Sequence, residues 1–395
     1  MGQRRIARRA FRWICRLIVL LVLLLLAAAI YLEKAGVPGF VKTRMVDAIR
    51  ARGWDVEFST LRFDWKRGIL AENMQLQRAR GKPGPVIFLD EAACRLDPNA
   101  LRNFNLQLES VRLRGGRIIW PFRETNQQTA TFELAKVEGE LLFKANDLWQ
   151  LRSLSAELLG TTVQISGTLS NASVIRDWKF PKGTKQTPEA TQALWRRIVA
   201  GAGRVKFVGQ PQLITRFQGD ARQLESLNAE LRFLASGIET PWGNATNALL
   251  HIRILPAQLA EPLQAELELT ADNAASEWCR ARKLRLNWEI EPPFISLFPT
   301  NAHVAVDLLA PESPWAKAHH AIATVHVTPL QTNLALFRTE IHGALDQLQS
   351  DWGQSDYSQV SLSLEHSGTN VVPSAISGEV RLNNARTPWG EAVQA

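Results

Sequence analysis

The sequence predicts a mainly β fold: an N-terminal transmembrane helix, then an extended, curled antiparallel sheet built from two-strand repeats of about 37 residues, with few short helices. Three observations predict it. One long apolar run lies near the N-terminus, and the phrase TPWGNA at Thr240 returns as TPWGEA at Thr387. After the first phrase, and after three similar ones that precede the last, apolar and polar residues alternate. Alternation with a period of two is the pattern of a strand with one buried and one solvated face.

The apolar run spans Leu17–Leu32 and extends back to Trp13 if Arg16 reaches the interface. A stretch of roughly 20 such residues crosses a bilayer as a helix. We therefore expect a basic tail at 1–12 and a transmembrane anchor at 13–33. A cleaved signal peptide is the alternative, because Ala27–Ala29 resembles a small-residue cleavage site. Six arginines precede the run and only three basic residues follow it closely, which predicts a cytoplasmic N-terminus and a chain that lies mostly beyond the membrane.

The formal net charge of +8 comes mainly from those six arginines, and the rest of the chain carries only +2. Because positive and negative charges are nearly equal in the rest of the chain, its net charge does not indicate binding to DNA or RNA, and no nucleic-acid partner is expected. The three cysteines give little information about structure or function. Cys15 lies in the apolar run, and Cys94 and Cys279 show neither a CxxC motif nor spacing that supports a metal site or a disulfide.

Five tryptophans in similar settings mark an internal repeat. They are spaced by 36, 37, 37 and 37 residues, and a small residue follows three places after each one. The tryptophans are Trp242, Trp278, Trp315, Trp352 and Trp389, and the small residues are Ala245, Ala281, Ala318, Ser355 and Ala392. Self-similarity at a fixed period of this length is the signature of a repeat architecture, in which each unit contacts mainly its neighbours.

The positions 8, 10 and 12 residues after the first four tryptophans are apolar in every repeat, and positions 9 and 11 are polar. From these positions we take a candidate lipid-contacting set. It consists of Leu250, Ile252, Ile254, Leu286, Trp288, Ile290, Val325, Val327, Val360, Leu362 and Leu364. A strand also precedes each of the first two tryptophans, so each unit is expected to be two strands joined by a turn and followed by a proline-containing loop.

Two interpretations of the shared apolar face remain open. A one-sided antiparallel sheet ordinarily buries that face against a second sheet or against helices. An extended, curled sheet could instead enclose an apolar trough whose natural occupant is a hydrocarbon chain. At about 0.8 kcal/mol per buried CH₂, a chain of about 16 carbons needs on the order of 12 kcal/mol of apolar contact to leave a bilayer without penalty. Only a continuous apolar lining supplies that much.

The region before the repeats is also β-rich. We expect one module over 34–175, with a helix from Pro38 that carries Val41, Met45 and Ile49 on one face and ends near Gly53. After it, 55–79 should form a strand, a turn at 65–68 and a second strand. A helical or linker insertion is expected at 176–202, with its best helix at 188–199. The repeat region then runs over 203–395, and its last copy stops early.

The order of these segments resembles that of the AsmA-like family, which includes TamB and the larger bridge-like lipid-transfer proteins. The resemblance rests on the basic N-terminus and anchor, on GVPGFVKTRMVDAIRARGWDVEFSTLRFDWKRGI from Gly36, on LLGTTVQISGTL from Leu158, and on the repeats. It implies an inner-membrane anchor and a periplasmic β-groove that carries phospholipid or another acyl-chain lipid, or that supports outer-membrane biogenesis. An outer-membrane protein is then a further partner. The shortened last copy predicts either a fragment of a longer protein or a final strand that pairs with a partner.

An enzyme is not expected, because the catalytic motifs GxSxG, HExxH and GxxxxGK[ST] are absent from the sequence. No cofactor and no metal site are predicted. His251 and His326 are expected on the polar face of the repeats, and Asp90, Glu91 and Asp97 in a solvated turn. A non-conducting envelope scaffold that binds client proteins by β-strand addition is the alternative function. The repeated tryptophans are interpreted as structural staples packed over their turns, whereas Trp288 is expected to contact lipid.

Overall fold

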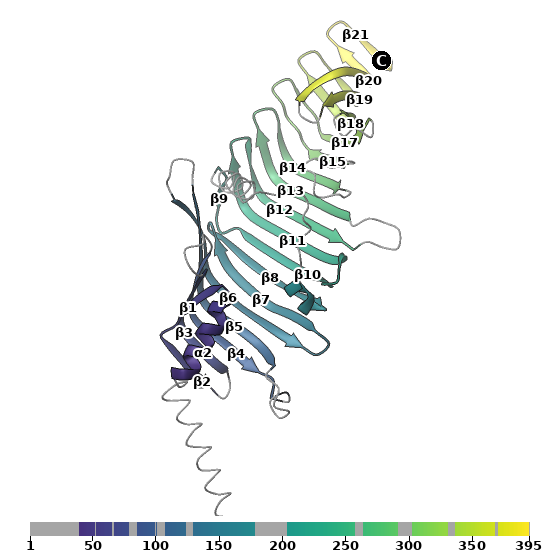
Figure 1. The fold of residues 1–395 in the computed structure, drawn as a ribbon. Helices are drawn as coiled ribbons and strands as arrows, with labels where there is room; N and C mark the ends of the chain where they lie inside the picture. Colours follow the sequence, from purple (N-terminus) through teal and green to yellow (C-terminus); the bar gives the residue numbers. More distant parts are fainter. Residues whose placement is uncertain are drawn as a thin grey trace, which may run out of the picture. The chain divides into compact units, whose positions relative to one another are not determined.

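Strands dominate both units of the chain (Figure 1). The computed structural model describes residues 39–51, 53–64, 67–78, 85–98, 100, 107–123, 129–177, 204–256, 264–290, 302–330, 336–367 and 370–394. Unit 1 comprises Met1–Lys144 and Leu151–Leu159, and unit 2 comprises Ala145–Gln150 and Gly160–Ala395. The expectation of a mainly β, mostly antiparallel open architecture with few helices is therefore confirmed.

Several expected segments lie outside the described residues. They are the tail at 1–12, the anchor at 13–33 and the helix at 188–199. Among the residues that are described, no helix is long and apolar enough to cross a membrane.

Unit 1 begins with one helix and continues as an antiparallel meander. The helix α2 (Gly39–Ala51) ends where the N–H of Gly53 donates to the Arg50 carbonyl at 2.9 Å, with Gly53 at a φ of 86°, so the expected helix and its glycine stop are confirmed. The strands are β1 (Trp54–Glu57), β2 (Thr60–Asp64), β3 (Gly68–Arg78), β4 (Val86–Leu96), β5 (Leu108–Arg123), β6 (Thr129–Lys144) and β7 (Leu148–Leu158). Both β1 and β2 pair with β3, which pairs in turn with β4, and the meander continues through β5 and β6.

The prediction of a single strand before the turn at 65–68 is wrong. The chain breaks into β1 and β2 at Ser59, whose N–H and hydroxyl both donate to the Glu72 carbonyl at 3.0 Å. On β3, Asn73 has a φ of 49° and donates its amide to the Ser59 hydroxyl at 3.0 Å. A residue with a left-handed backbone inside a strand marks a local irregularity, and a bulge of this kind is invisible to an alternation pattern.

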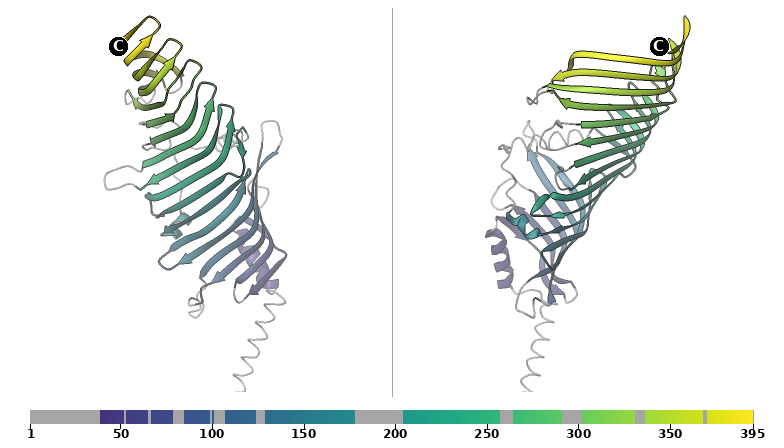
Figure 2. Two further views of the ribbon diagram at one scale, coloured as in Figure 1. Left: turned by 180° about the vertical axis from the view of Figure 1, so that it is seen from behind. Right: turned by 90° about the vertical axis from the view of Figure 1, so that its right-hand side faces the viewer.

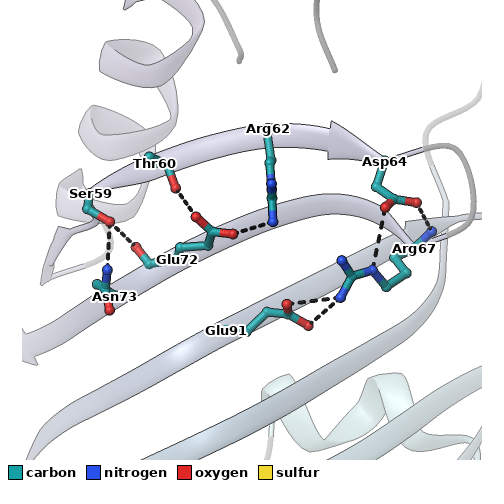
Figure 3. A network of polar contacts seen from close by, with 8 residues as sticks. All are labelled: Ser59, Thr60, Arg62, Asp64, Arg67, Glu72, Asn73 and Glu91. Atoms are coloured by element: carbon teal, nitrogen blue, oxygen red, sulfur yellow. Dashed lines mark hydrogen bonds and ion pairs between the residues drawn. The ribbon is translucent and has the colours of Figure 1, made fainter. Parts of the chain in front are cut away.

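A network of charged side chains ties β2, β3 and β4 together (Figure 3). Glu72 accepts from the Thr60 hydroxyl at 2.6 Å and pairs with Arg62. Arg67 donates to both carboxylate oxygens of Glu91 at 3.0 Å and also pairs with Asp64. Glu91 and its neighbour Asp90 lie within β4, so the prediction that they belong to a solvated turn is wrong. This charge-assisted pair gives Glu91 a structural role in the sheet.

Several apolar side chains of unit 1 are buried. Leu70 is 0% exposed, and Val56, Leu61, Leu89 and Val137 are each at most 6% exposed. Unit 1 therefore has a conventional core, in which apolar strand residues are removed from water by protein.

Unit 2 is a long succession of strands, seen from three sides in Figures 1 and 2. They are β8 (Thr161–Ser170), β9 (Lys206–Val208), β10 (Gln212–Asp220), β11 (Gln223–Thr240), β12 (Gly243–Leu255), β13 (Gln264–Ser276), β14 (Arg280–Ile290), β15 (Ala302–Leu309), β16 (Ala316–Lys317), β17 (His320–Pro329), β18 (Leu336–Ser350), β19 (Gly353–Ser367), β20 (Asn370–Thr387) and β21 (Gly390–Gln394). A 3₁₀ helix, η1 (Ala172–Asp177), follows β8. Among the described residues, the strands of unit 2 pair antiparallel except β8 with β10, which are parallel.

The repeated tryptophans lie in five copies of one turn. In each copy, a Ser or Thr hydroxyl two residues before the tryptophan accepts from the tryptophan N–H at 3.2–3.3 Å. The same hydroxyl donates to the carbonyl of the residue after the tryptophan at 2.8–3.2 Å. The hydroxyl residues are Thr240, Ser276, Ser313, Ser350 and Thr387. Hydroxyls commonly satisfy turn backbone in this way. The repeat unit of two strands and a turn is thus confirmed.

A residue with a left-handed backbone lies three or four residues from the turn in several copies, before the turn in three of them and after it in one. Asn247, Asn273, Gln347 and Asn384 all have φ values between 45° and 52°. Asn247 donates to the Asp272 carboxylate at 3.1 Å, and Asn384 donates to that of Asp356 at 2.9 Å. A bulge adds one residue, so it shifts the alternation by one and bends the strand. The strands of unit 2 bend near their turns in Figure 2.

The close approach of the strand that follows limits which residues some turns accept. A Cβ added to Gly243 would lie 2.1 Å from the Ala275 carbonyl oxygen, whereas a Cβ on Gly390 meets nothing within 4 Å. We expect Gly243→Ala to destabilise the protein by about 1–3 kcal/mol through overpacking. Urea denaturation measures the effect. Gly390→Ala, the same change in the same turn motif, is the matched control and should stay within about 0.5 kcal/mol of the parent. Equal effects at the two glycines would contradict the assigned packing.

Two arginines hold one carboxylate of unit 1. Glu140 pairs with Arg112 and Arg152, each at 2.8 Å. Burial by itself would raise the pKa of Glu140, but the two guanidinium groups outweigh it and lower that pKa. A lowered carboxyl pKa stabilises the fold above the unfolded value of about 4.3, and the contribution disappears as the pH falls through the folded value.

We therefore expect Glu140→Gln to melt at a lower temperature than the parent at pH 7 and at the same temperature near pH 3. Thermal melting followed by circular dichroism tests this. The exposed Glu138 on the same strand supplies the control, and Glu138→Gln should change little at either pH. A melting difference for Glu140→Gln that persists near pH 3 would rule out the ion pairs as its cause.

Candidate functional site

Three rows of mostly apolar residues cross the strands of unit 2 side by side, because cross-strand partners point to the same face of a sheet. The middle row joins Leu231, Ile252, Leu267, Trp288, Val304, Val325, Ile341, Leu362 and Gly378. The row nearer the tryptophan turns joins Phe233, Leu250, Leu269, Leu286, Val306, Ala323, Gly343, Val360 and Val380. The third row joins Ala229, Ile254, Ala265, Ile290, Ala302, Val327, Thr339, Leu364 and Ile376. We call the side formed by these rows the apolar face.

All eleven residues of the predicted set occupy these rows, Ile290 by its register position alone. The structure therefore brings together residues that lie up to 114 positions apart in the sequence. Sequence reasoning named no residue of β15 or β18 in this set. Part of the signal was present, since Val304 follows His303, Val306 precedes Asp307, and Ile341 lies between Glu340 and His342.

The large side chains of the apolar face are only partly removed from water. In contrast with unit 1, the fully buried apolar residues of unit 2 are mostly alanines, such as Ala235, Ala248, Ala271 and Ala281. None of the Leu, Ile, Val, Phe and Trp residues whose exposure is described on the three rows falls in the buried class. On β20 two of them are largely exposed, Ile376 at 64% and Val380 at 58%. The described large side chains of the rows are therefore not sealed from water as those in the core of a closed sandwich would be.

Polar groups enter the apolar face at the end farthest from the tryptophan turns. Thr339 on the third row is buried, and its hydroxyl lies 2.9 Å from Nε2 of His366. The His366 ring stacks on Phe337 with centroids 6.0 Å apart. The Thr339 hydroxyl and the His366 ring nitrogen thus form a hydrogen bond with each other. These polar atoms can therefore lie beside an apolar neighbour at this end of the face.

The opposite side of the sheet carries alternating charges. Arg253 pairs with Glu266, and Arg285 pairs with Glu268. Glu230 accepts from Arg232 and also contacts His251 at 2.8 Å, and these hydrogen bonds, the Arg232 bond first, lower its pKa. Solvated pairs of this kind contribute little stability individually, but they give the sheet a hydrated outer side.

The expected positions of the histidines are confirmed. His251 lies on the charged side, as does His326, whose ring stacks on that of His303 with centroids 4.4 Å apart. His320 bridges Asp307 at 2.9 Å and Asp346 at 3.5 Å. Within the described ranges, no three His, Cys, Asp or Glu side chains gather as metal ligands would. Cys94 and Cys279 are both free thiols, and burial raises the pKa of Cys94.

A hollow of about 500 Å³ opens on the apolar face beside the first two tryptophan turns. Its lining includes the buried Ala248, Ala271 and Ala281, together with Thr240 and Trp242 of the first turn. Leu269, Leu284 and Leu308 line the side toward the middle of the sheet. The hollow therefore lies next to the turns, where the lining residues are small alanines, and larger side chains such as Leu269 begin one row further in.

The tryptophans do not pack over their turns, so the staple interpretation is wrong. The exposed fractions are 68% for Trp242, 64% for Trp278, 53% for Trp315, 63% for Trp352 and 83% for Trp389. The turns are held by the Ser or Thr hydroxyl and by backbone groups, which any residue could supply at the tryptophan position. Trp278 and Trp315 stack on each other, with ring centroids 6.4 Å apart.

No protein-family model, curated protein or solved structure shows significant similarity to the chain. The resemblance to the AsmA-like family thus remains a prediction.

Proposed function

We propose that this chain is a membrane-anchored envelope protein that carries phospholipid along the apolar face of unit 2. The anchor is the segment 13–33, in the inner membrane, with the bulk of the chain in the periplasm. This is the role that the resemblance to the AsmA-like family implies: the protein conducts phospholipid between the inner and outer membranes or supports outer-membrane biogenesis. One observation carries the proposal: the partial exposure of apolar rows that continue across consecutive strands.

The continuity of the rows suits a hydrocarbon ligand. From Leu231 to Leu362 the middle row passes over eight strands without a polar side chain. Neighbouring strands lie about 4.8 Å apart, so this stretch extends for about 35 Å. An acyl chain that slid along such a surface would keep its apolar contacts throughout, at about 0.8 kcal/mol for each covered CH₂.

The partial exposure of the apolar rows also suits a hydrocarbon ligand. Soluble proteins seldom expose apolar patches larger than a few hundred Å², and larger ones mark binding surfaces. Among the described residues, unit 2 contains no α-helix that could cover the rows. The charged pairs on the opposite side keep that side in water, so the ligand is confined to one side of the sheet.

A charge on the apolar face should expel lipid. We expect Val325→Asp to reduce co-purifying phospholipid several-fold, because the carboxylate would lose its hydration under an acyl chain. The full chain is purified in mild detergent from a membrane-containing host, extracted with organic solvent and quantified by mass spectrometry. The matched control is Thr324→Asp, on the neighbouring residue of the opposite side, where the cross-strand partners are Ala305 and His342.

Equal lipid in both variants would argue against transport along this face. A lipid-free parent protein that is stable and monodisperse would favour the alternative, a scaffold that binds client proteins by strand addition. Unfolding of Val325→Asp, but not of Thr324→Asp, would mean that the face is a closed protein core.

A further inference from the structure

We propose that the row of exposed tryptophans is a headgroup site: it holds amine-bearing, zwitterionic phospholipids whose acyl chains lie along the strands of the apolar face. This inference rests on the proposed function and adds the class and orientation of the ligand. It starts from the tryptophan side chains, which the fold itself does not need.

The turn uses only the backbone of the tryptophan. Its N–H donates to the Ser or Thr hydroxyl, and the indole of each copy is more than half exposed. Exposure of the largest side chain in five successive hairpins has no structural benefit, because a small or polar residue would form the same hydrogen bonds. The indole ring has an apolar body and one polar N–H, the combination found at the boundary between hydrocarbon and water.

The placement of the indoles matches such a boundary. All five turns lie at the same ends of the strands, because each joins the end of one repeat strand to the start of the next. The apolar face begins directly beside them, and alanines of that face line the same hollow as Trp242. A ligand with an apolar tail in the hollow would therefore place its polar end among the turns.

The width of the apolar face fits one acyl chain laid along a strand. From Ala248, next to the turn, to Ile254 on the third row, six residue steps of about 3.4 Å give about 20 Å. The hydrocarbon of one leaflet is about 15 Å thick, half of a bilayer core of about 30 Å. A chain with its polar end at the turns is thus covered along its whole length.

The charges at the turns select the headgroup. Charged residues within the turns and immediately beside them comprise five acids and three bases. They are Glu239, Glu277, Glu312, Asp351 and Glu391, and Arg280, Lys317 and Arg386. This excess of acid gives no attraction for an anionic headgroup. An ammonium group, however, is attracted both to carboxylates and to the face of an indole, while the interspersed bases can pair with the phosphate.

The hairpin between β13 and β14 contains two tryptophans that report on orientation. Trp278 lies at the turn, and Trp288 lies on the middle row of the apolar face. The full chain in detergent is titrated with phosphatidylethanolamine that carries a nitroxide either on the headgroup or near the end of one acyl chain. Tryptophan quenching is compared between the parent, Trp278→Phe and Trp288→Phe.

With the headgroup label, we expect Trp278→Phe to lose more of the quenched amplitude than Trp288→Phe, and with the chain label we expect the reverse. The opposite ranking, or equal losses for both labels, would overturn the orientation while leaving lipid binding intact. Quenching by labelled phosphatidylglycerol as strong as that by phosphatidylethanolamine would overturn the headgroup assignment. If neither label quenches and no lipid co-purifies with the parent, the proposed function itself fails.

Discussion

The cross-strand register of unit 2 is the constraint on which the rest of the structure depends. Because side chains alternate between the faces of a strand, a slip of one residue would move the whole apolar set to the opposite side. The five hydroxyl-capped turns fix where each hairpin reverses, and the bulges at residues such as Asn247 add their extra residue at defined positions. Ile252, Trp288, Val325 and Leu362 therefore fall on one row, although their repeats differ in sequence and in loop length.

The sequence predicts the parts of this arrangement that depend on alternation alone. The hairpins, the apolar rows and the polar side with His251 and His326 all follow from a period of two. The break between β1 and β2 was not predictable, because it depends on the left-handed backbone of Asn73 and its bond to Ser59. The hydroxyl residue of each turn can be found in the sequence, because a Ser or Thr stands two residues before each of the five repeated tryptophans.

Exposure is the property that alternation cannot reveal. An apolar residue at every second position has the same pattern whatever the exposure of its side chain, as Leu70 and Ile252 show. Leu70 is 0% exposed, whereas Ile252 is half-buried. The tryptophans illustrate the same limit, since only the structure separates the turn, made by backbone and hydroxyl, from an indole that extends into solvent. The same strand pattern therefore accompanies fully buried side chains such as Leu70 and partly exposed ones such as Ile252.

Photo-crosslinking in intact cells tests most directly whether that surface faces lipid. A benzophenone amino acid replaces Leu286 on the apolar face or, as the control, Arg285 on the charged side of the same strand. The account predicts a phospholipid adduct, found by mass spectrometry of the irradiated protein, at position 286 and not at 285. An adduct at position 286 that consists only of polypeptide would contradict it, because the apolar face would then be covered by protein.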